Sequence, residues 1–314
     1  MGAKITVIGA GNVGATIAYN LSSSSKVSEI VVIDVNKQKV EGEVLDILQG
    51  TAFRDPIKIR GGEYADAAGS DIVIITAGVG RKPGQSRIDL TQTNVNILKS
   101  FAPEIAKYAP DSLYIMVANP VDVLTYVFTK ISGIPEKQII GSGTILDTAR
   151  LRSTISEHFH IAQKSCHANV FGEHGDTQFV PWSQAKISGI YINDIYDKLP
   201  ESMKVEELDY EEVERHVRTS GGQIISNKGA TFYAVATAVC RLCDMLLAAY
   251  DSVACVSTVL HGEYGIEDVA LSVLTLIGPN GVKGRLEMPL TEEEHDKLVK
   301  SAEALKDIIS QITI

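Results

Sequence analysis

Short apolar runs alternate with amphipathic segments through the first 143 residues of this 314-residue chain. The apolar runs, at residues 4–8, 29–34, 71–76 and 113–118, are rich in β-branched side chains, which predicts buried strands. The segments between them space their apolar residues as helices do. This alternation predicts an α/β fold with a doubly wound parallel sheet, in which ligands bind at the carboxyl ends of the strands.

The pattern changes in the second half of the chain. Helices are expected at residues 208–228, whose Glu and Arg spacing is typical of a solvated face, and at 231–249. Strands are expected at 253–260 and 269–277, the second running into the turn Gly278-Pro279-Asn280-Gly281. Thr291 and Glu294 form a capping-box pattern before a last helix. We therefore expect a dinucleotide-binding domain over residues 1–143 and an α+β substrate domain over residues 144–314.

A glycine-rich turn follows the first predicted strand. Gly9-Ala10-Gly11-Asn12-Val13-Gly14 has the spacing GxGxxG and leads into a helical pattern, whose N-terminal amides can bind a pyrophosphate. Asp34 ends the next strand 20 residues later, where a carboxylate can bind ribose hydroxyls and repel a 2′-phosphate. These features predict NAD as the cofactor. The residues expected to contact it are Gly9, Gly11, Asn12, Val13, Gly14, Asp34, Thr76, Ala77, Gly78 and Asn119.

Composition and charge narrow the classes of function. Hydrophobic residues make up 45% of the chain and charged residues 22%, as in globular proteins. The formal net charge of -10 argues against general binding to nucleic acid or to an anionic membrane. No signal-peptide pattern or membrane-length apolar run is present, so a cytoplasmic location is expected. Cys240 and Cys243 lack a second pair with metal-ligand spacing, so no metal site is expected.

The candidate chemistry centres on His174, in the stretch Gly172-Glu173-His174-Gly175-Asp176. An isolated histidine of this kind is usually a hydrogen-bonded loop residue. An imidazole at a strand end beside a nicotinamide could also take a hydroxyl proton as hydride leaves the same carbon. Asp147 is the candidate carboxylate that would raise its pKa. Arg150, on the same helix face as Asp147, offers a planar fork that suits a substrate carboxylate.

A polar loop with three cations follows the strand at residues 71–76. Its composition is typical of a flap that closes over a site, although an ordinary exposed basic loop is the alternative. Arg87, brought in by this flap, could polarise a substrate carbonyl, and Asn119 could donate a hydrogen bond to it. Together with a dinucleotide-binding fold, these residues indicate a 2-hydroxy acid dehydrogenase.

The chain resembles the L-lactate/malate dehydrogenase family over essentially its whole length. The matching stretches are GAGNVG at 9–14, Gln85-Ser86-Arg87, Ala118-Asn119-Pro120-Val121-Asp122, Leu146-Asp147-Thr148-Ala149-Arg150 and Gly172-Glu173-His174-Gly175-Asp176. The resemblance implies that His174 is the general acid/base, that Asp147 orients it, that Arg150 binds the substrate carboxylate and that Arg87 polarises the carbonyl. It also implies a small 2-oxo or 2-hydroxy acid as substrate, NAD as cofactor and a homo-oligomer, either tetramer or dimer.

One flap residue favours the malate branch of this family. The residue six before the polarising arginine faces the variable end of the substrate, as glutamine in lactate enzymes and arginine in malate enzymes. Here it is Arg81. A second carboxylate needs a cation at that point, whereas a methyl group would leave a buried charge unpaired at a cost of about 3–5 kcal/mol. We therefore predict malate and oxaloacetate as the substrates.

Other features favour L-lactate dehydrogenase, which stays the alternative. Thr231 stands where lactate enzymes carry a threonine, and residues 182–185 and 262–266 are similar to bacterial lactate enzymes. Arg152 and His167 match the residues with which allosteric lactate dehydrogenases bind fructose 1,6-bisphosphate, but ordinary surface residues would look the same. A non-catalytic NAD(H)-sensing protein is a more distant alternative, because a sensor has no need of the four residues His174, Asp147, Arg150 and Arg87 together.

Overall fold

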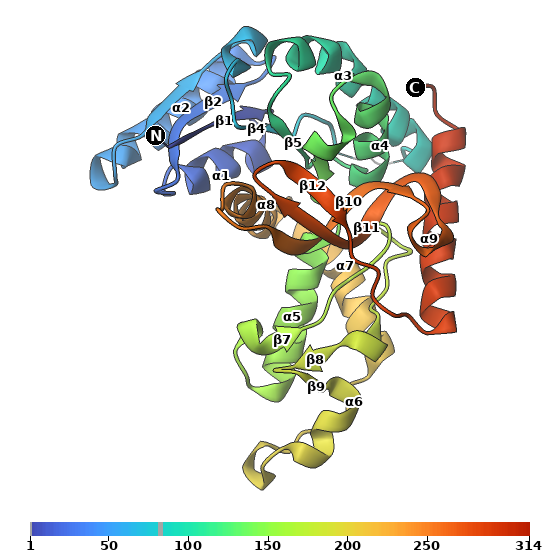
Figure 1. Ribbon diagram of the computed structural model, residues 1–314. Coiled ribbons are helices and arrows are strands. Elements are labelled where there is room, and N and C mark those ends of the chain that lie inside the picture. Colours follow the sequence, from blue (N-terminus) through green and yellow to red (C-terminus); the bar gives the residue numbers. More distant parts are fainter. Residues whose placement is uncertain (1, 81–83) are drawn as a thin grey trace.

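A large mixed sheet runs through the molecule (Figure 1). The computed structural model describes residues 2–80 and 84–314, and within them nine strands pair in the order β12-β11-β10-β6-β5-β4-β1-β2-β3. The parallel strands are β1 (Ala3–Ile8), β2 (Val27–Ile33), β3 (Lys58–Gly61), β4 (Ile72–Ile75), β5 (Leu113–Met116) and β6 (Ile139–Gly141). Their order, 3-2-1-4-5-6, is that of dinucleotide-binding sheets. The predicted doubly wound parallel sheet is confirmed.

Helices cover both faces of this sheet, because its central strands are apolar on both sides. Successive side chains of a strand point to opposite faces, so Ile72 and Ile74 of β4 face one core while Val73 and Ile75 face the other. The first core is covered by α1 (Asn12–Leu21), α2 (Lys37–Gly50) and α8 (Tyr233–Leu246). The second is covered by α3 (Arg87–Tyr108), α4 (Val121–Ile131) and α9 (Glu292–Ser310).

Strands from the second half of the chain extend the same sheet. They are β10 (Ser252–His261), β11 (Glu267–Gly278) and β12 (Gly281–Arg285), and all three are antiparallel to their neighbours. β10 joins the parallel strands through the pairing of Ser257 with Gly141 of β6. The predicted strands and the hairpin turn at residues 278–281 are confirmed, as is the capping box of Thr291 and Glu294 at the start of α9.

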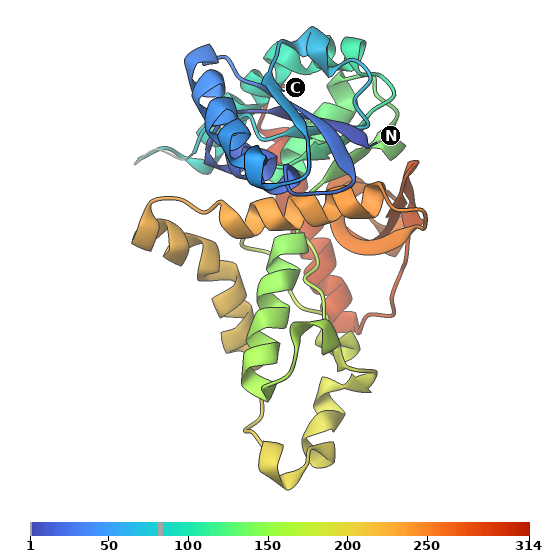
Figure 2. The same ribbon diagram turned by 90° about the vertical axis from the view of Figure 1, so that its left-hand side faces the viewer.

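A third core lies beside the large sheet, in the part that projects from it in Figure 2. It is formed by α5 (Ile145–Phe159), α7 (Tyr210–Lys228), the short helix α6 (Ile192–Ile195) and a small sheet of β7 (Cys166–His167), β8 (Lys186–Ile187) and β9 (Ile190–Tyr191). Leu151 and Phe159 of α5 are buried in the same core as Val213 and Val217 of α7. This packing fixes α5 and α7 side by side, and both helices carry residues of the site described below.

The helix α3 begins at Arg87, within the segment expected to form a flap. The amide of Asp89 donates a hydrogen bond of 3.0 Å to the hydroxyl of Ser86, which therefore caps the helix and makes Arg87 its first residue. The prediction that Arg87 belongs to a flap is wrong for this reason. Arg87 is fixed to a helix of 22 residues.

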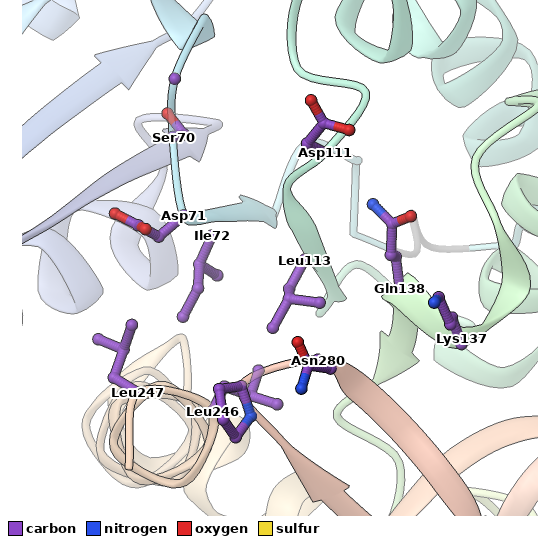
Figure 3. A pocket seen from close by; sticks show the side chains of 12 residues that line it. Ser70, Asp71, Ile72, Asp111, Leu113, Lys137, Gln138, Leu246, Leu247 and Asn280 are labelled. Carbon is purple, nitrogen blue, oxygen red and sulfur yellow. The ribbon is translucent and has the colours of Figure 1, made fainter. Parts of the chain in front are cut away.

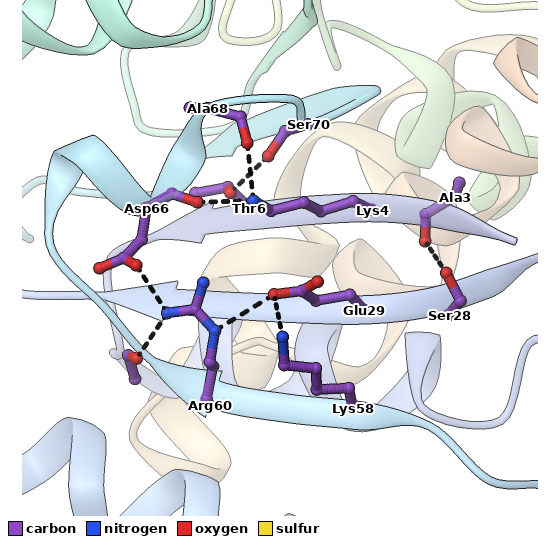
Figure 4. Close-up of polar contacts among 11 residues, drawn as sticks. Ala3, Lys4, Thr6, Ser28, Glu29, Lys58, Arg60, Asp66, Ala68 and Ser70 are labelled. Carbon is purple, nitrogen blue, oxygen red and sulfur yellow. Dashed lines mark hydrogen bonds and ion pairs between the residues drawn. The ribbon is translucent and has the colours of Figure 1, made fainter.

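Ion pairs link β2 to the edge strand β3 (Figure 4). Arg60 of β3 lies 3.1 Å from Glu29 of β2 and 2.8 Å from Asp66, and Lys58 lies 3.2 Å from Glu29. Burial raises the pKa of Glu29, but the hydrogen bonds from Lys58 and Arg60 outweigh it and leave this pKa below its ordinary value. Charged side chains of this kind also protect an edge strand from pairing with another chain.

Among the helices of the described residues, none combines the length and the apolar character needed to cross a membrane.

Candidate active site

The glycine-rich turn between β1 and α1 is closely packed. Gly9 has a φ of +107°, which favours glycine, and a Cβ on Gly14 would lie only 1.8 Å from the carbonyl oxygen of Gly9. The hydroxyl of Thr76, at the end of β4, donates to the carbonyl oxygens of Ile8 and Gly9, at 3.0 Å and 3.1 Å. Neither Gly9 nor Gly14 can carry a side chain without moving this backbone.

The surroundings of this turn fit a dinucleotide. Gly11 caps α1 without any side-chain hydrogen bond, and a Cβ on Gly11 would meet no atom of the described residues within 4 Å, so the helix N-terminus is open to a phosphate in this part of the structure. Asp34 accepts hydrogen bonds from the amides of Ala10 (2.6 Å) and Asn36 (2.9 Å). Each carboxylate oxygen keeps a further lone pair. Asp34 can therefore bind a ribose hydroxyl while it holds the turn.

The ends of β4 and β5 are joined by a residue that no sequence motif singles out. Asn94 of α3 is 1% exposed, and its side-chain oxygen accepts a hydrogen bond of 2.8 Å from the amide of Val79. Its side-chain nitrogen donates one of 2.7 Å to the carbonyl oxygen of Asn119. Asn94 therefore fixes the segment that contains Ala77 and Gly78 relative to Asn119, which precedes a cis proline peptide bond. A single polar residue within a helical pattern carries no signal for this role.

His174, Asp147 and Arg150 form one hydrogen-bonded group. The imidazole Nδ1 of His174 lies 2.5 Å from a carboxylate oxygen of Asp147, and the other oxygen accepts a hydrogen bond of 2.8 Å from Arg150. The Asp147 side chain is 2% exposed and the His174 side chain 27% exposed. Asp147 thus holds the imidazole by Nδ1, which leaves Nε2 for a ligand in the adjacent cleft.

The charges of this group act on one another. Burial alone would lower the pKa of His174, but the Asp147 carboxylate outweighs it, so that the pKa lies above its ordinary value. Burial likewise would raise the pKa of Asp147, but the imidazolium of His174 and the guanidinium of Arg150 hold it below its ordinary value. The arrangement therefore favours a protonated imidazole beside an ionised carboxylate. The imidazolium carries one proton that it can transfer.

The backbone around His174 is held by three distant elements. Gly172, with a φ of +90°, exchanges hydrogen bonds of 2.9 Å and 3.0 Å with Ser272 of β11. A Cβ on Gly172 would come within 2.7 Å of the hydroxyl of Ser301 in α9. The amide of His174 donates a hydrogen bond of 2.7 Å to Asp122 of α4, a carboxylate that is 2% exposed. Asp122 is thus a positioning residue to which the sequence motif alone assigned no role.

A cleft of about 300 Å³ opens beside His174. The expected site residues that line it are Val13, Asn119, Asp147, Arg150, His174 and Thr231. The helix α7, whose charge spacing predicted a solvated face, adds a wall formed by Arg218, Gly221, Gly222 and Ile225. Each glycine within a helix costs about 1 kcal/mol relative to alanine. The cleft thus brings together residues from separate stretches of the chain.

Arg87, expected to polarise the substrate carbonyl, is not among the described residues that line this cleft. The guanidinium of Arg87 forms an ion pair with the buried carboxylate of Glu173, and it lies 3.7 Å from Asp176. Arg87 is therefore next to the His174 stretch, but it is turned towards the two acids of that stretch. Arg81 lies outside the described residues.

The two residues of the expected effector site differ in their environment. Arg152 donates hydrogen bonds of 2.9 Å to the carbonyl oxygen of Ala168 and of 3.1 Å to the side chain of Asn169. Burial lowers the pKa of Arg152. His167 is exposed on β7. Some of the hydrogen-bond donors of Arg152 are therefore already used within its own subunit. A bisphosphate site formed by Arg152 and His167 stays a prediction.

A larger cavity of about 590 Å³ lies at the opposite edge of the sheet (Figure 3). Asp71, Asp111 and Lys137, which precede β4, β5 and β6, line it together with Leu246 and Asn280. It is thus at the amino ends of these strands, whereas doubly wound sheets bind their ligands at the carboxyl ends. Size alone would favour this cavity over the cleft beside His174, but the turn of Gly9, Asn119 and His174 all belong to the other edge.

Comparisons with known proteins identify the family of this chain. Residues 3–141 match the family model described as lactate/malate dehydrogenase, NAD binding domain, and residues 144–313 match lactate/malate dehydrogenase, alpha/beta C-terminal domain. The chain is 44% identical to L-lactate dehydrogenase 1 of Clostridium acetobutylicum, over 98% of both chains. It is 46% identical to the L-lactate dehydrogenase of Acetivibrio thermocellus, over 99% of this chain and 98% of the relative.

A solved structure shares the whole fold. The crystal structure of minor L-lactate dehydrogenase from Enterococcus mundtii matches with a TM-score of 0.94 and 33% identity, and the match covers 100% of this chain and 99% of the other. The matches to the family models and to the relatives extend over nearly all of the sequence. The chain therefore belongs to the lactate/malate dehydrogenase family and is an NAD-dependent 2-hydroxy acid dehydrogenase.

Proposed function

We propose that this protein interconverts pyruvate and L-lactate with NAD(H). The observation that carries the proposal is the name shared by its relatives, which are 42–46% identical over nearly the whole chain and are L-lactate dehydrogenases. Thr231, which stands where lactate enzymes carry a threonine, lines the cleft together with His174. These names favour lactate over the malate preference that Arg81 predicts.

The proposed proton transfer runs through His174. When pyruvate is reduced, the imidazolium donates its Nε2 proton to the carbonyl oxygen, and when lactate is oxidised the neutral imidazole accepts the hydroxyl proton. The bound nicotinamide cofactor supplies or accepts the hydride. Asp147 stabilises the imidazolium through the 2.5 Å hydrogen bond to Nδ1. Its burial keeps water from weakening that interaction.

Substrate binding is assigned to Arg150 and Asn119. Arg150 uses one nitrogen for Asp147, and its planar fork keeps further donors for the substrate carboxylate. Asn119 lines the same cleft and can donate a hydrogen bond to the carbonyl oxygen. The proposed role of Arg87 is to polarise that carbonyl. To do so, its guanidinium must leave the Glu173 carboxylate and bind the substrate.

Malate dehydrogenase is the second candidate, because Arg81 is the residue type that a second substrate carboxylate requires. The test compares kcat/KM for pyruvate and oxaloacetate, each with NADH. We expect the higher value for pyruvate. A higher value for oxaloacetate would overturn the lactate proposal in favour of malate.

The variant Arg81→Gln tests whether this arginine meets the substrate. If it does, the ratio of kcat/KM for pyruvate to that for oxaloacetate should rise roughly a hundredfold, because the dicarboxylate loses its counter-charge. Arg241→Gln is the matched control, since Arg241 is exposed on α8 and is not among the described residues that line the cleft. An unchanged ratio in Arg81→Gln would remove the basis of the malate candidate.

Assembly belongs to the same proposal. A homo-oligomer, tetramer or dimer, is expected from the family resemblance, and light scattering of the purified protein measures it.

A further inference from the structure

The helix α7 turns one distinct face towards the cleft. Arg218, Gly221, Gly222 and Ile225 are spaced at i, i+3, i+4 and i+7, so they share one side of the helix, and all four line the cleft beside His174 and Arg150. Two adjacent glycines thus form the middle of a cleft wall. They lie well inside a helix of 19 residues.

No backbone conformation or contact of the described residues requires glycine at these two positions. Neither Gly221 nor Gly222 is among the residues with a positive φ. Among the described residues, a Cβ on Gly222 would meet no atom within 4 Å, and one on Gly221 would make only ordinary contacts with Arg150, at 3.5 Å and 3.9 Å. Alanine would fit both positions and would stabilise the helix. What the two glycines provide is empty space in the cleft, next to the guanidinium of Arg150.

The surroundings of this space are mainly apolar. Ile225, one turn further along α7, is 49% exposed although it is a large aliphatic residue at the cleft wall. Leu146 and Val235 line the same cleft. Arg218 is the charged member of the α7 face, and its side chain is exposed to solvent. A substrate substituent that leaves the Arg150 region along α7 would therefore meet glycine backbone and aliphatic carbon.

We propose that Gly221 and Gly222 adapt the cleft to 2-oxo acids whose side chain is larger than the methyl group of pyruvate, with branched aliphatic side chains as the best fit. This inference rests on the proposed function, in which Arg150 binds the substrate carboxylate and His174 protonates the carbonyl. The space beside Arg150 then takes up the side chain. The bound side chain covers the exposed Ile225. The removal of this apolar surface from water increases the affinity for the substrate.

The test measures kcat/KM with NADH for pyruvate and for 2-oxo-4-methylpentanoate, a branched 2-oxo acid. We expect the wild-type protein to use the branched acid within about tenfold of pyruvate. Gly222→Leu fills the space, and kcat/KM for the branched acid should fall at least about tenfold, the effect of a misfit of one or two methylene groups. The value for pyruvate should fall less, so the ratio of kcat/KM for the branched acid to that for pyruvate should decrease.

Two further variants make the result specific. Gly42→Leu is the matched control, because Gly42 also lies within a helix, α2, and is exposed. Of the residues that the structure describes, none comes within 4 Å of a Cβ on Gly42, and Gly42 itself is not among those that line the cleft. Gly222→Ala should give a smaller decrease for the branched acid together with an unchanged or higher melting temperature. A lower kcat/KM at an unchanged or higher melting temperature shows that the cleft is narrower and that the fold is intact.

The outcomes distinguish this inference from the proposed function. If pyruvate is reduced but kcat/KM for the branched acid is lower by more than about tenfold, or if Gly222→Leu leaves the ratio of the two values unchanged, the inference is overturned and the proposed function stands. If no 2-oxo acid is reduced at all, the proposed function itself fails.

Discussion

Replacement of His174 by glutamine is expected to lower kcat for pyruvate reduction about 10²–10⁴-fold, the usual contribution of a general acid. Glutamine keeps a polar side chain of similar size, but it carries no proton that it can give to the carbonyl oxygen. The change is measured by the loss of NADH absorbance at saturating pyruvate. Binding of NADH, followed by its fluorescence, should stay within about threefold of the wild type, because the glycine-rich turn that binds it is unchanged.

His216→Gln is the matched control for this variant. His216 is exposed on α7, and it is not among the described residues that line the cleft. It should have the kcat of the wild type. A His174→Gln protein that keeps more than a tenth of the wild-type kcat would show that the proton comes from another group.

Replacement of Arg150 by lysine is expected to lower kcat/KM for pyruvate about 10²–10³-fold, in line with the 2–5 kcal/mol lost when a buried, hydrogen-bonded charge pair is broken. The lysine keeps the positive charge near Asp147 but cannot make two parallel hydrogen bonds to a carboxylate. Most of the loss should be an increase in KM. Steady-state kinetics with varied pyruvate measures it.

Arg241→Lys, on the exposed side of α8, is the control for the same exchange. It should leave kcat/KM unchanged. A KM for pyruvate in Arg150→Lys equal to that of the wild type would mean that another residue binds the substrate carboxylate. Arg218, which lines the same cleft, would then be the first residue to examine.

The parallel sheet could be predicted because its strands are buried on both faces. Such strands appear in the sequence as continuous apolar runs, as β4 does with four residues that are at most 1% exposed. The glycine-rich turn is equally clear, since Gly14 packs against the backbone of Gly9 and no other residue fits there. In both cases the local sequence is constrained by contacts that any such sheet makes.

Other features depend on tertiary contacts that leave little trace in the sequence. Asn94 acts through hydrogen bonds to two strand ends, and no spacing rule connects it with Asn119, 25 residues away. The charged residues of α7 predict a solvated helix. Its packing against α5, which places Gly221 next to Arg150, cannot be inferred from that pattern. The expected flap extends too far, because the Ser86 hydroxyl caps α3 and makes Arg87 a helix residue.

The pH dependence of kcat/KM for pyruvate reduction, in the wild type and in Asp147→Asn, tests most directly whether His174 transfers the proton under the control of Asp147. Reduction needs the protonated imidazole, so kcat/KM should fall as the pH rises through the pKa of His174, which Asp147 holds above its ordinary value of 6.5. In Asp147→Asn the burial remains but the carboxylate is lost, and the inflection should move to lower pH. An inflection at the same pH in both proteins would contradict this account.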